Sequence, residues 1–151
     1  MGSAKAVFVD TNVLIDVACA ERVEHAAARE MFLRAARGGQ CRFYALSSSL
    51  KDVYYVLCRH YARERDARDA VIGLATELGI VDLTKRMVLD GCLSDEPDVE
   101  DALVRIAAES VDARVIVSRD RRAFARCLIP RMTPREFLDA MGASCLAGLT
   151  D

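Results

Sequence analysis

A short apolar run near the start of the chain constrains the fold more than any other feature. Val7, Phe8 and Val9 follow one another without a polar interruption, and Asp10 comes directly after them. An unbroken run of this kind is typical of a strand buried on both faces of a parallel sheet. A helical pattern begins at once after Asp10. The run therefore predicts an α/β protein with a carboxylate at the carboxyl end of a buried strand, where such sheets bind ligands.

The rest of the chain alternates between helical and strand patterns. We predict helices over residues 13–20, 21–37, 50–62, 66–78, 85–93, 98–110, 121–126 and from 133 onward. We predict further strands over residues 41–46, 80–83 and 114–117, and a short edge strand within residues 128–132, where a proline is tolerated. This alternation predicts a three-layer α/β/α sandwich around a central parallel sheet of four to five strands.

Local signals mark several helix ends. Gly38-Gly39 should end the second helix, and Ser47-Ser48-Ser49 offers N-cap candidates for the third. Thr84 should cap the helix over residues 85–93. Thr133-Pro134-Arg135-Glu136 predicts a capping box at the start of the last helix. In the 85–93 helix we expect three apolar residues to face inward: Met87, Val88 and Leu89.

Length and composition indicate one ordinary globular domain. We predict a single domain over residues 1–151, with its core at roughly 5–140 and a loose tail over 142–151. The chain is 52% hydrophobic and 29% charged, and no apolar run is long enough to cross a bilayer. The first residues lack the layout of a signal peptide, so we expect a cytoplasmic protein without a membrane contact.

Neither the cysteines nor the net charge indicates a ligand. No two of the six cysteines lie at Cys-x-x-Cys spacing, which favours buried thiols in a reducing compartment over a zinc site. A net charge of −2 argues against a protein that coats nucleic acid electrostatically. It does not exclude a nuclease, because bound divalent cations change the sign of the charge locally.

Four aspartates fall where a parallel sheet would bring them to one edge. Asp10 and Asp120 each follow a buried apolar strand. Asp101 lies at the start of a helix, three residues after Asp98, and Asp52 lies in the first turns of another helix. If both strands are central and parallel, Asp10 and Asp120 emerge at the same edge of the sheet. The pattern predicts one acidic site.

Each acid also has a purely structural interpretation. Asp10, Asp98 and Asp120 could cap the helices that they precede, and Asp52 could be a surface acid. For Asp98 we favour the cap. Clustered carboxylates repel one another unless they are protonated or neutralised, and hard Mg²⁺ or Mn²⁺ ions prefer oxygen ligands. One or two such ions would activate water for phosphodiester cleavage.

The arginines form two groups along the chain. The first group contains Arg59, Arg63, Arg65 and Arg68, and the second contains Arg119, Arg121, Arg122, Arg126, Arg131 and Arg135. A solvated helix face is the favoured interpretation of the first group. The second group begins beside Asp120, so a solvated face and a contact with phosphate both stay open for it.

Four segments, taken in order, resemble the PIN-domain ribonucleases, the family that includes VapC-type toxins. They are residues 9–16, 47–57, 98–103 and 115–124, within a similarity that covers roughly residues 5–140. The resemblance implies four catalytic metal ligands: Asp10, Asp52, Asp101 and Asp120. Asp52 stands where these toxins often have glutamate, so it would bind metal directly or through water.

The resemblance also implies roles for residues beside these acids. Thr11 or Asn12, together with Ser118, would orient the acids or a water molecule. Independently of the resemblance, their position beside Asp120 makes three arginines candidates for contact with the phosphates of RNA: Arg119, Arg121 and Arg122. Asp16, further along the first helix, we expect to be a surface charge.

The function that the resemblance implies is a Mg²⁺- or Mn²⁺-dependent endoribonuclease that hydrolyses single-stranded or structured RNA. It also implies a homodimer and a small antitoxin protein as partner. One alternative is a catalytically silent PIN-like module that binds other proteins. Another is a phospho-receiver domain, which we rank last. A receiver would have a second acid after the first strand and a lysine after a late one, where this chain has Thr11-Asn12 and Ser118-Arg119.

Overall fold

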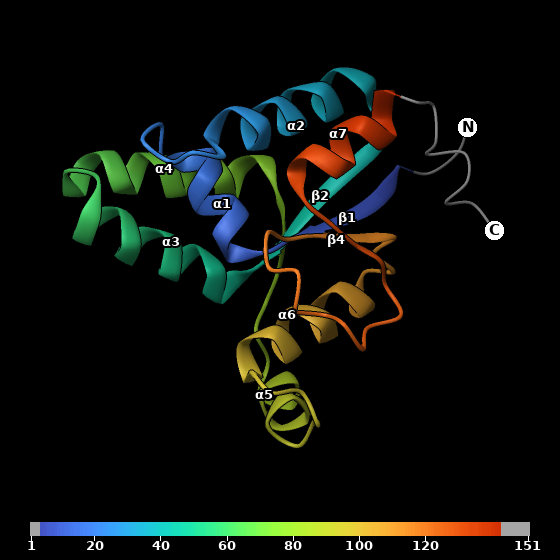
Figure 1. Cartoon of the computed structure of the whole chain (residues 1–151). Helices are drawn as coiled ribbons and strands as arrows, with labels where there is room; N and C mark the ends of the chain where they lie inside the picture. The colour runs from blue at the N-terminus through green and yellow to red at the C-terminus, as the bar shows by residue number, and fades with distance from the viewer. Residues whose placement is uncertain (1–3, 143–151) are drawn as a thin grey trace.

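The computed structural model describes residues 4–142, with five strands and seven helices (Figure 1). In chain order they are β1 (Lys5–Val9), α1 (Thr11–Ala18), α2 (His25–Gly38), β2 (Cys41–Leu46), α3 (Ser47–His60), α4 (Glu64–Glu77), β3 (Gly79–Val81), α5 (Lys85–Cys92), α6 (Val99–Ser110), β4 (Val115–Val117), β5 (Arg131–Met132) and α7 (Pro134–Gly142). The predicted loose tail, apart from its first residue, lies outside the described residues.

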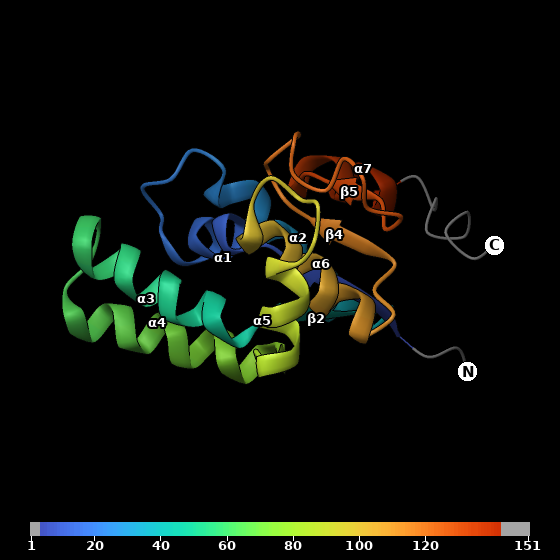
Figure 2. The same cartoon turned by 90° about the horizontal axis from the view of Figure 1, so that it is seen from below.

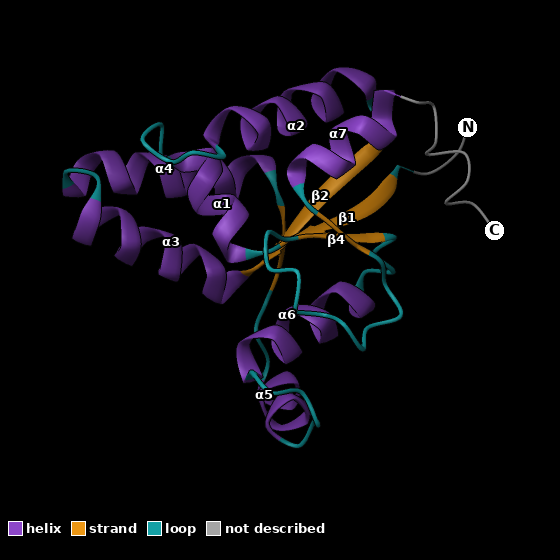
Figure 3. Ribbon diagram, in the orientation of Figure 1, coloured by secondary structure: helices purple, strands orange, loops and turns teal. Residues whose placement is uncertain are grey.

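The five strands form one sheet in the order β3-β2-β1-β4-β5, and every neighbouring pair is parallel. β1 is the central strand, with Val7 opposite Phe43 of β2 and opposite Val115 of β4. Helices cover both faces of the sheet (Figure 3). The predicted three-layer sandwich around a parallel sheet is confirmed.

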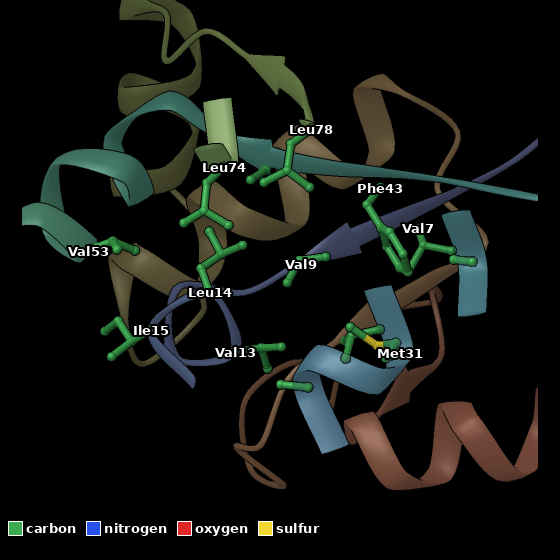
Figure 4. Close-up of a cluster of buried hydrophobic side chains, with 14 of the residues drawn as sticks. Val7, Val9, Val13, Leu14, Ile15, Met31, Phe43, Val53, Leu74 and Leu78 are labelled. Atoms are coloured by element: carbon green, nitrogen blue, oxygen red, sulfur yellow. The ribbon is translucent and has the colours of Figure 1, made fainter. Parts of the chain in front are cut away.

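The alternation of side chains along β1 divides the core between the two faces. Val7 and Val9 point into one cluster, which they share with Phe43 and with residues of α1, α2, α3, α4 and α7 (Figure 4). Phe8 points to the opposite face and packs with Val104 of α6. β1 is therefore buried on both faces, as its unbroken apolar sequence predicts.

The helices extend the two layers differently. α2 and α7 lie together on one side of the sheet, and α6 lies on the other side with α5 beyond it (Figure 1). α3 and α4 run side by side and reach out past the sheet (Figure 2). Within residues 4–142, no helix is long and apolar enough to cross a membrane.

Three of the predicted helix ends are confirmed. Gly39 ends α2 in the left-handed conformation, with φ of 61°. The Thr84 hydroxyl accepts a hydrogen bond from the backbone N–H of Met87. The backbone N–H of Thr133 donates to Glu136 Oε2 at 2.7 Å, and the backbone N–H of Glu136 donates to Thr133 Oγ1 at 3.2 Å, which forms the predicted capping box.

The predicted helix over residues 121–126 is wrong. These residues form bends and turns, and Phe124 has a φ of 64°. A right-handed helix requires a negative φ, so the segment cannot continue as one. Asp120 sets the first turn instead, because its Oδ1 accepts hydrogen bonds from the backbone N–H groups of Arg122 and Ala123.

The inward orientation predicted for α5 is also wrong in part. Val88 is 38% exposed and Leu89 is 49% exposed, whereas Met87 is partly buried. α5 turns a different face to α6. Gly91 is buried there, and a Cβ at this position would lie 2.9 Å from Leu103 of α6. α5 and α6 approach each other closely at Gly91, so the side chains of Val88 and Leu89 on α5 are left exposed to solvent.

Most helices begin within two residues of the predicted position, but α3 begins three residues earlier and α2 four residues later. α3 begins at Ser47 itself, so the three serines lie in its first turn, and Leu46 at the N-cap provides no side-chain bond. The Ser47 hydroxyl instead accepts a hydrogen bond from the backbone N–H of Leu83, beyond β3. α2 begins at His25, because residues 19–24 form a turn that brings Arg22 back to α1.

Candidate active site

A cavity of about 280 Å³ lies at the carboxyl ends of β1 and β4, and we call it the acidic cavity. Its walls include the four predicted acids, Asp10, Asp52, Asp101 and Asp120, and two more, Asp98 and Glu100. The cavity lies where the strand order turns from β2 on one side of β1 to β4 on the other. Such a switch point is where open α/β sheets bind ligands.

Asp10 is both a helix cap and a wall of the acidic cavity. Its Oδ1 accepts a hydrogen bond from the backbone N–H of Thr11 at 2.7 Å, and its Oδ2 accepts one from the Ser118 hydroxyl at 2.7 Å. The residue is only 8% exposed. Burial raises the pKa of this carboxyl although both hydrogen bonds oppose the shift. The cap and the site are therefore compatible roles of one side chain.

Ser118 connects two of the acids across the end of the sheet. Its hydroxyl donates to Asp10 and accepts the backbone N–H of Asp120 at 3.1 Å. The two backbone N–H groups that Asp120 accepts, from Arg122 and Ala123, lower the pKa of its carboxyl. Asp120 is exposed and stays ionised, whereas Asp10 is buried beside it.

Asp101 carries the clearest electrostatic signature of the site. It lies in the first turn of α6 and is half-buried. Burial first, and then repulsion from Asp10, Asp98 and Asp120, raise the pKa of Asp101 to about 6. Asp98 itself caps α6 by accepting the backbone N–H of Glu100 at 2.8 Å, so the favoured interpretation of Asp98 as a cap is confirmed.

Asp52 lies on α3 and lines the cavity together with the acids of α6. Its Oδ1 lies 2.8 Å from Nζ of Lys51, an exposed neighbour. After burial, the charge of Asp52 is the next largest cause of the raised pKa of Glu100. Asp52 therefore adds to the negative potential of the cavity while a lysine at the rim partly offsets it.

The donor set fits a hard divalent cation. Six carboxylates line one small cavity. The charge of Asp120 contributes to the raised pKa of Asp10. The charges of Asp10 and Asp120 both contribute to the raised pKa of Asp101. In residues 4–142, no three histidine, cysteine, aspartate or glutamate side chains are already gathered into a metal-binding group. The carboxylates are crowded enough to repel, and a cation between them would relieve that repulsion.

The predicted supporting residues differ in what they contact. Ser118 holds Asp10 directly, as described above. Thr11 donates its backbone N–H to Asp10, but its hydroxyl donates to the Ser49 hydroxyl at 2.8 Å. Asn12 is exposed and lines the cavity. Ser49, which sequence reasoning missed, is buried and ties α3 to the start of α1.

The expectation that Asp16 is a surface charge is wrong. Asp16 is 1% exposed and lies against two arginines. Nε of Arg22 donates to its Oδ1 at 2.7 Å, and Nε of Arg119 lies 2.7 Å from its Oδ2 without the geometry of a hydrogen bond. A signal was present in the sequence, because Asp16 interrupts an apolar run in the first helix.

The ion pair with Asp16 distinguishes Arg119 from the other two arginines that were predicted to contact RNA. Arg119 is turned toward Asp16 behind the site, where its charge still lowers the pKa of Asp10. Arg121 and Arg122 follow Asp120 in the chain and are both exposed, and Arg122 lines a neighbouring cavity that shares Asp120 with the acidic cavity. Arg122 is therefore better placed than Arg119 to contact a phosphate.

Comparison with known proteins adds a family and a fold. The sequence profile of the PIN domain matches residues 6–122, which is more than half of the chain. This match includes β4, all of β1 except Lys5, and all four predicted acids. No curated protein sequence matches the chain significantly.

Several solved structures share the fold at low sequence identity. VapC20 of Mycobacterium tuberculosis, described as a Sarcin-Ricin loop cleaving toxin, has a TM-score of 0.64 and 18% identity over 80% of this chain and 94% of its own. VapBC2 of Rickettsia felis, solved with a DNA fragment from its promoter, has a TM-score of 0.62 and 13% identity over 85% and 98%. PAE2754 of Pyrobaculum aerophilum has a TM-score of 0.62 and 17% identity over 94% and 99%.

Proposed function

Because the chain belongs to the PIN domain family, whose members are typically nucleases that use divalent metal ions, we propose that it is a Mg²⁺- or Mn²⁺-dependent endoribonuclease. One observation carries the proposal: the four acids singled out in the sequence, Asp10, Asp52, Asp101 and Asp120, line one cavity. The substrate class that we propose is single-stranded RNA, including unpaired segments of structured RNA.

In this proposal the four acids bind the metal ions in different ways. Asp10, Asp101 and Asp120 hold one or two ions, and Asp52 contributes directly or through a water molecule. A bound Mg²⁺ or Mn²⁺ supplies a Lewis acid that activates water and neutralises negative charge on the phosphate. Ser118 keeps Asp10 in a fixed orientation through the 2.7 Å hydrogen bond, so this ligand does not need to reorganise.

The exposed arginines provide the attraction for RNA that the acidic cavity lacks. Arg121 and Arg122 follow Asp120 directly and would bind phosphates of the RNA next to the cleaved bond. In this proposal the affinity for RNA depends on the bound metal ions and on these few arginine contacts. A protein with a net charge of −2 can then bind RNA without a large basic surface.

We further propose that the protein is the toxin of a toxin–antitoxin pair, located in the cytoplasm where RNA and partner would meet. Support comes from the fold that it shares with VapC20 and with the VapBC2 complex. A short neighbouring gene that encodes a protein with a DNA-binding start would provide the partner. Co-expression should then give a stable complex whose RNA cleavage is suppressed.

The homodimer that the resemblance implies is also a proposal. Light scattering on the purified chain should give twice the 16.6 kDa of one chain. A mass of one chain at micromolar concentration would contradict it.

RNA cleavage in defined metal conditions tests the proposed activity. The native protein should cleave single-stranded RNA with Mg²⁺ or Mn²⁺, and EDTA should abolish cleavage. Asp10→Asn should reduce cleavage by about a hundredfold or more, because it removes a buried metal ligand. Asp101→Asn provides a second variant should Asp10→Asn fail to fold. Asp69→Asn, an exposed acid on α4, is the matched control and should cleave like the native protein.

Cleavage that survives both EDTA and Asp10→Asn would contradict the proposal. The alternative, a catalytically silent module that binds other proteins, makes a different prediction in calorimetry. A folded native protein that binds no Mn²⁺ would favour that module.

A further inference from the structure

A second cavity adjoins the acidic cavity and extends beyond the proposed metal ligands. Its volume is about 390 Å³, and Asp98, Asp101 and Asp120 line both cavities. Sites for small ligands commonly measure about 300–1,000 Å³. We call it the loop cavity, because residues 122–127 form one of its walls.

The lining of the loop cavity combines an apolar wall with charged residues of both signs, which are Glu96, Asp98, Asp101, Asp120, Arg105, Arg122 and Arg126. The apolar wall consists of Pro97, Ala123, Phe124 and Ala125. Arg122 and Arg126 border this wall, and both are exposed. An apolar surface beside two guanidinium groups suits a ligand that has a flat, weakly polar part and a negative charge.

The arginines of this cavity are not equally available. Arg105 also lines it, but its Nε lies 2.6 Å from Glu96 and its guanidinium also pairs with Glu109. Among the ion pairs of residues 4–142, none holds Arg122 or Arg126. Nη1 of Arg126 donates a hydrogen bond to the backbone carbonyl of Asp95 at 3.5 Å, which leaves the rest of its guanidinium, like that of Arg122, able to bind a phosphate.

The wall formed by residues 122–127 is held in one conformation. Phe124 has a φ of 64°, which is unfavourable for a residue with a side chain, and the residue is 8% exposed in the cluster that includes Phe8. The backbone N–H of Cys127 donates to the carbonyl of Phe124 at 2.9 Å. Asp120 fixes the other end through two backbone hydrogen bonds. Strain of this kind persists where surrounding contacts enforce it, commonly at functional sites.

We propose that the loop cavity binds one nucleotide of the RNA, next to the bond that is cleaved; this rests on the proposed ribonuclease function. The base lies on the wall that contains Phe124 and Ala125, and its phosphate faces Arg122 and Arg126. The three shared acids place this nucleotide beside the metal ligands.

The cavity then determines which RNA sequence is cut. Base stacking alone tolerates every base. A cavity of about 390 Å³ with a fixed wall at residues 122–127 also limits the size and shape of the base that fits. The protein should therefore show a base preference at one position beside the cleavage site, and residues 122–127 should determine it.

Nucleotide binding tests the cavity without any need for cleavage. The probes are the four nucleoside 5′-monophosphates, with ribose 5-phosphate as the probe that lacks a base. In an NMR titration, at least one monophosphate should shift the amide signals of residues 122–127. Ribose 5-phosphate should bind about tenfold or more weakly, because it lacks the base that contacts the apolar wall.

Variants at the cavity and away from it make the test specific. Ala125→Trp fills the loop cavity from an exposed position and leaves every acid in place, so it should weaken monophosphate binding at least tenfold. Arg126→Ala should weaken binding of the monophosphates and of ribose 5-phosphate alike. Ala75→Trp, at an exposed position of α4, is the matched control and should bind like the native protein.

Cleavage of a randomised single-stranded RNA pool links the cavity to the substrate. The ends produced by the native protein should show a preference at one flanking position, and Ala125→Trp should cut with that preference lost. Cleavage without binding of any monophosphate would overturn the loop cavity as a nucleotide site and leave the ribonuclease function intact. An unchanged preference in Ala125→Trp would also overturn it, and would leave the cavity to a protein partner. Nucleotide binding without cleavage would contradict the ribonuclease function and the place of the cavity in cleavage.

Discussion

At the scale of single residues, neighbouring carboxylates in one cavity differ in how easily they are protonated. Two backbone N–H groups lower the pKa of Asp120, whereas burial and the other acids raise the pKa of Asp101 to about 6. Asp101 is therefore ionised at neutral pH only against the repulsion of its neighbours. A bound cation would relieve this repulsion, and its binding is therefore favoured.

Asp101→Asn should stabilise the metal-free protein at high pH but not at low pH. The pKa of Asp101 lies above its ordinary value of 3.8, so the folded state binds the extra proton and stability falls as the pH rises from about 4 to about 6. Above about pH 6 the loss of folding stability caused by the ionised Asp101 has reached its full size. Solvent screens part of it at this half-exposed carboxyl. The melting temperature in EDTA should therefore rise by about 2–4 °C at pH 8, the shift expected from about 1 kcal/mol in a chain of this length.

The same substitution should leave the melting temperature nearly unchanged at pH 4, where the carboxyl of the folded native protein is already protonated. Asp69→Asn on α4 controls for the general effect of removing a negative charge. An equal rise at pH 4 and pH 8 would contradict repulsion as the cause.

Asp16→Asn should destabilise the protein although Asp16 lies outside the acidic cavity. Asp16 is buried between Arg22 and Arg119, and the substitution removes the charge that both guanidinium groups face. We expect a loss of about 2 kcal/mol in the free energy of unfolding, measured in urea. Glu30→Gln removes one partner of the exposed pair with Arg34 and should cost less than about 0.5 kcal/mol. Equal small losses for both would contradict a structural role of the buried pair.

At the scale of secondary-structure elements, short-range signals in the sequence predict some features well, and tertiary contacts override them at others. β2 has the predicted bounds, and the ends at Gly39, Thr84 and Thr133 depend on residues within one turn of each other. The segment at 121–126 depends on Asp120 and on the packing of Phe124, which no local pattern reveals. Its helical composition was therefore misleading.

A glycine fixes how closely β3 approaches β2. Gly79 pairs with Tyr44, and a Cβ at Gly79 would lie 2.4 Å from Cδ1 of the Tyr44 ring. Gly79→Ala should cost about 1–3 kcal/mol of unfolding free energy, because the ring must move. The cost should shrink in a Tyr44→Ala background, measured as a double-mutant cycle in urea.

Gly73→Ala is the matched control for this glycine. Gly73 lies inside α4, and a methyl group added there would meet nothing within 4 Å, so alanine should stabilise the helix by up to about 1 kcal/mol. A loss at Gly79 that is independent of Tyr44 would contradict the steric explanation.

At the scale of the whole molecule, the acidic cavity is formed by residues that lie far apart in the sequence and meet at one edge of the sheet. Its acids come from the ends of β1 and β4 and from α3 and α6, and Asp10 and Asp120 are joined through Ser118. The order of apolar strands and acids in the sequence predicts which residues meet at this edge. It does not predict the loop cavity or the burial of Asp16, because both depend on residues that lie far apart in sequence and close in space.

Metal binding should therefore stabilise the whole fold. With Mn²⁺ at about 100 times its dissociation constant, linkage predicts a gain of about 2.7 kcal/mol, which corresponds to roughly 5–10 °C in the melting temperature. Asp10→Asn should show little of this gain, and Asp69→Asn should show all of it. A native melting temperature that does not respond to Mn²⁺ would contradict metal binding in the cavity.

The most direct test of the central claim is the anomalous scattering of Mn²⁺ in a crystal soaked with MnCl₂. We predict an anomalous peak inside the acidic cavity, bounded by the carboxylates of Asp10, Asp101 and Asp120, with Asp52 bound directly or through water. The peak should be absent from crystals of Asp10→Asn. A native crystal that binds Mn²⁺ only outside this cavity, or not at all, would contradict the assignment of these acids as a metal centre.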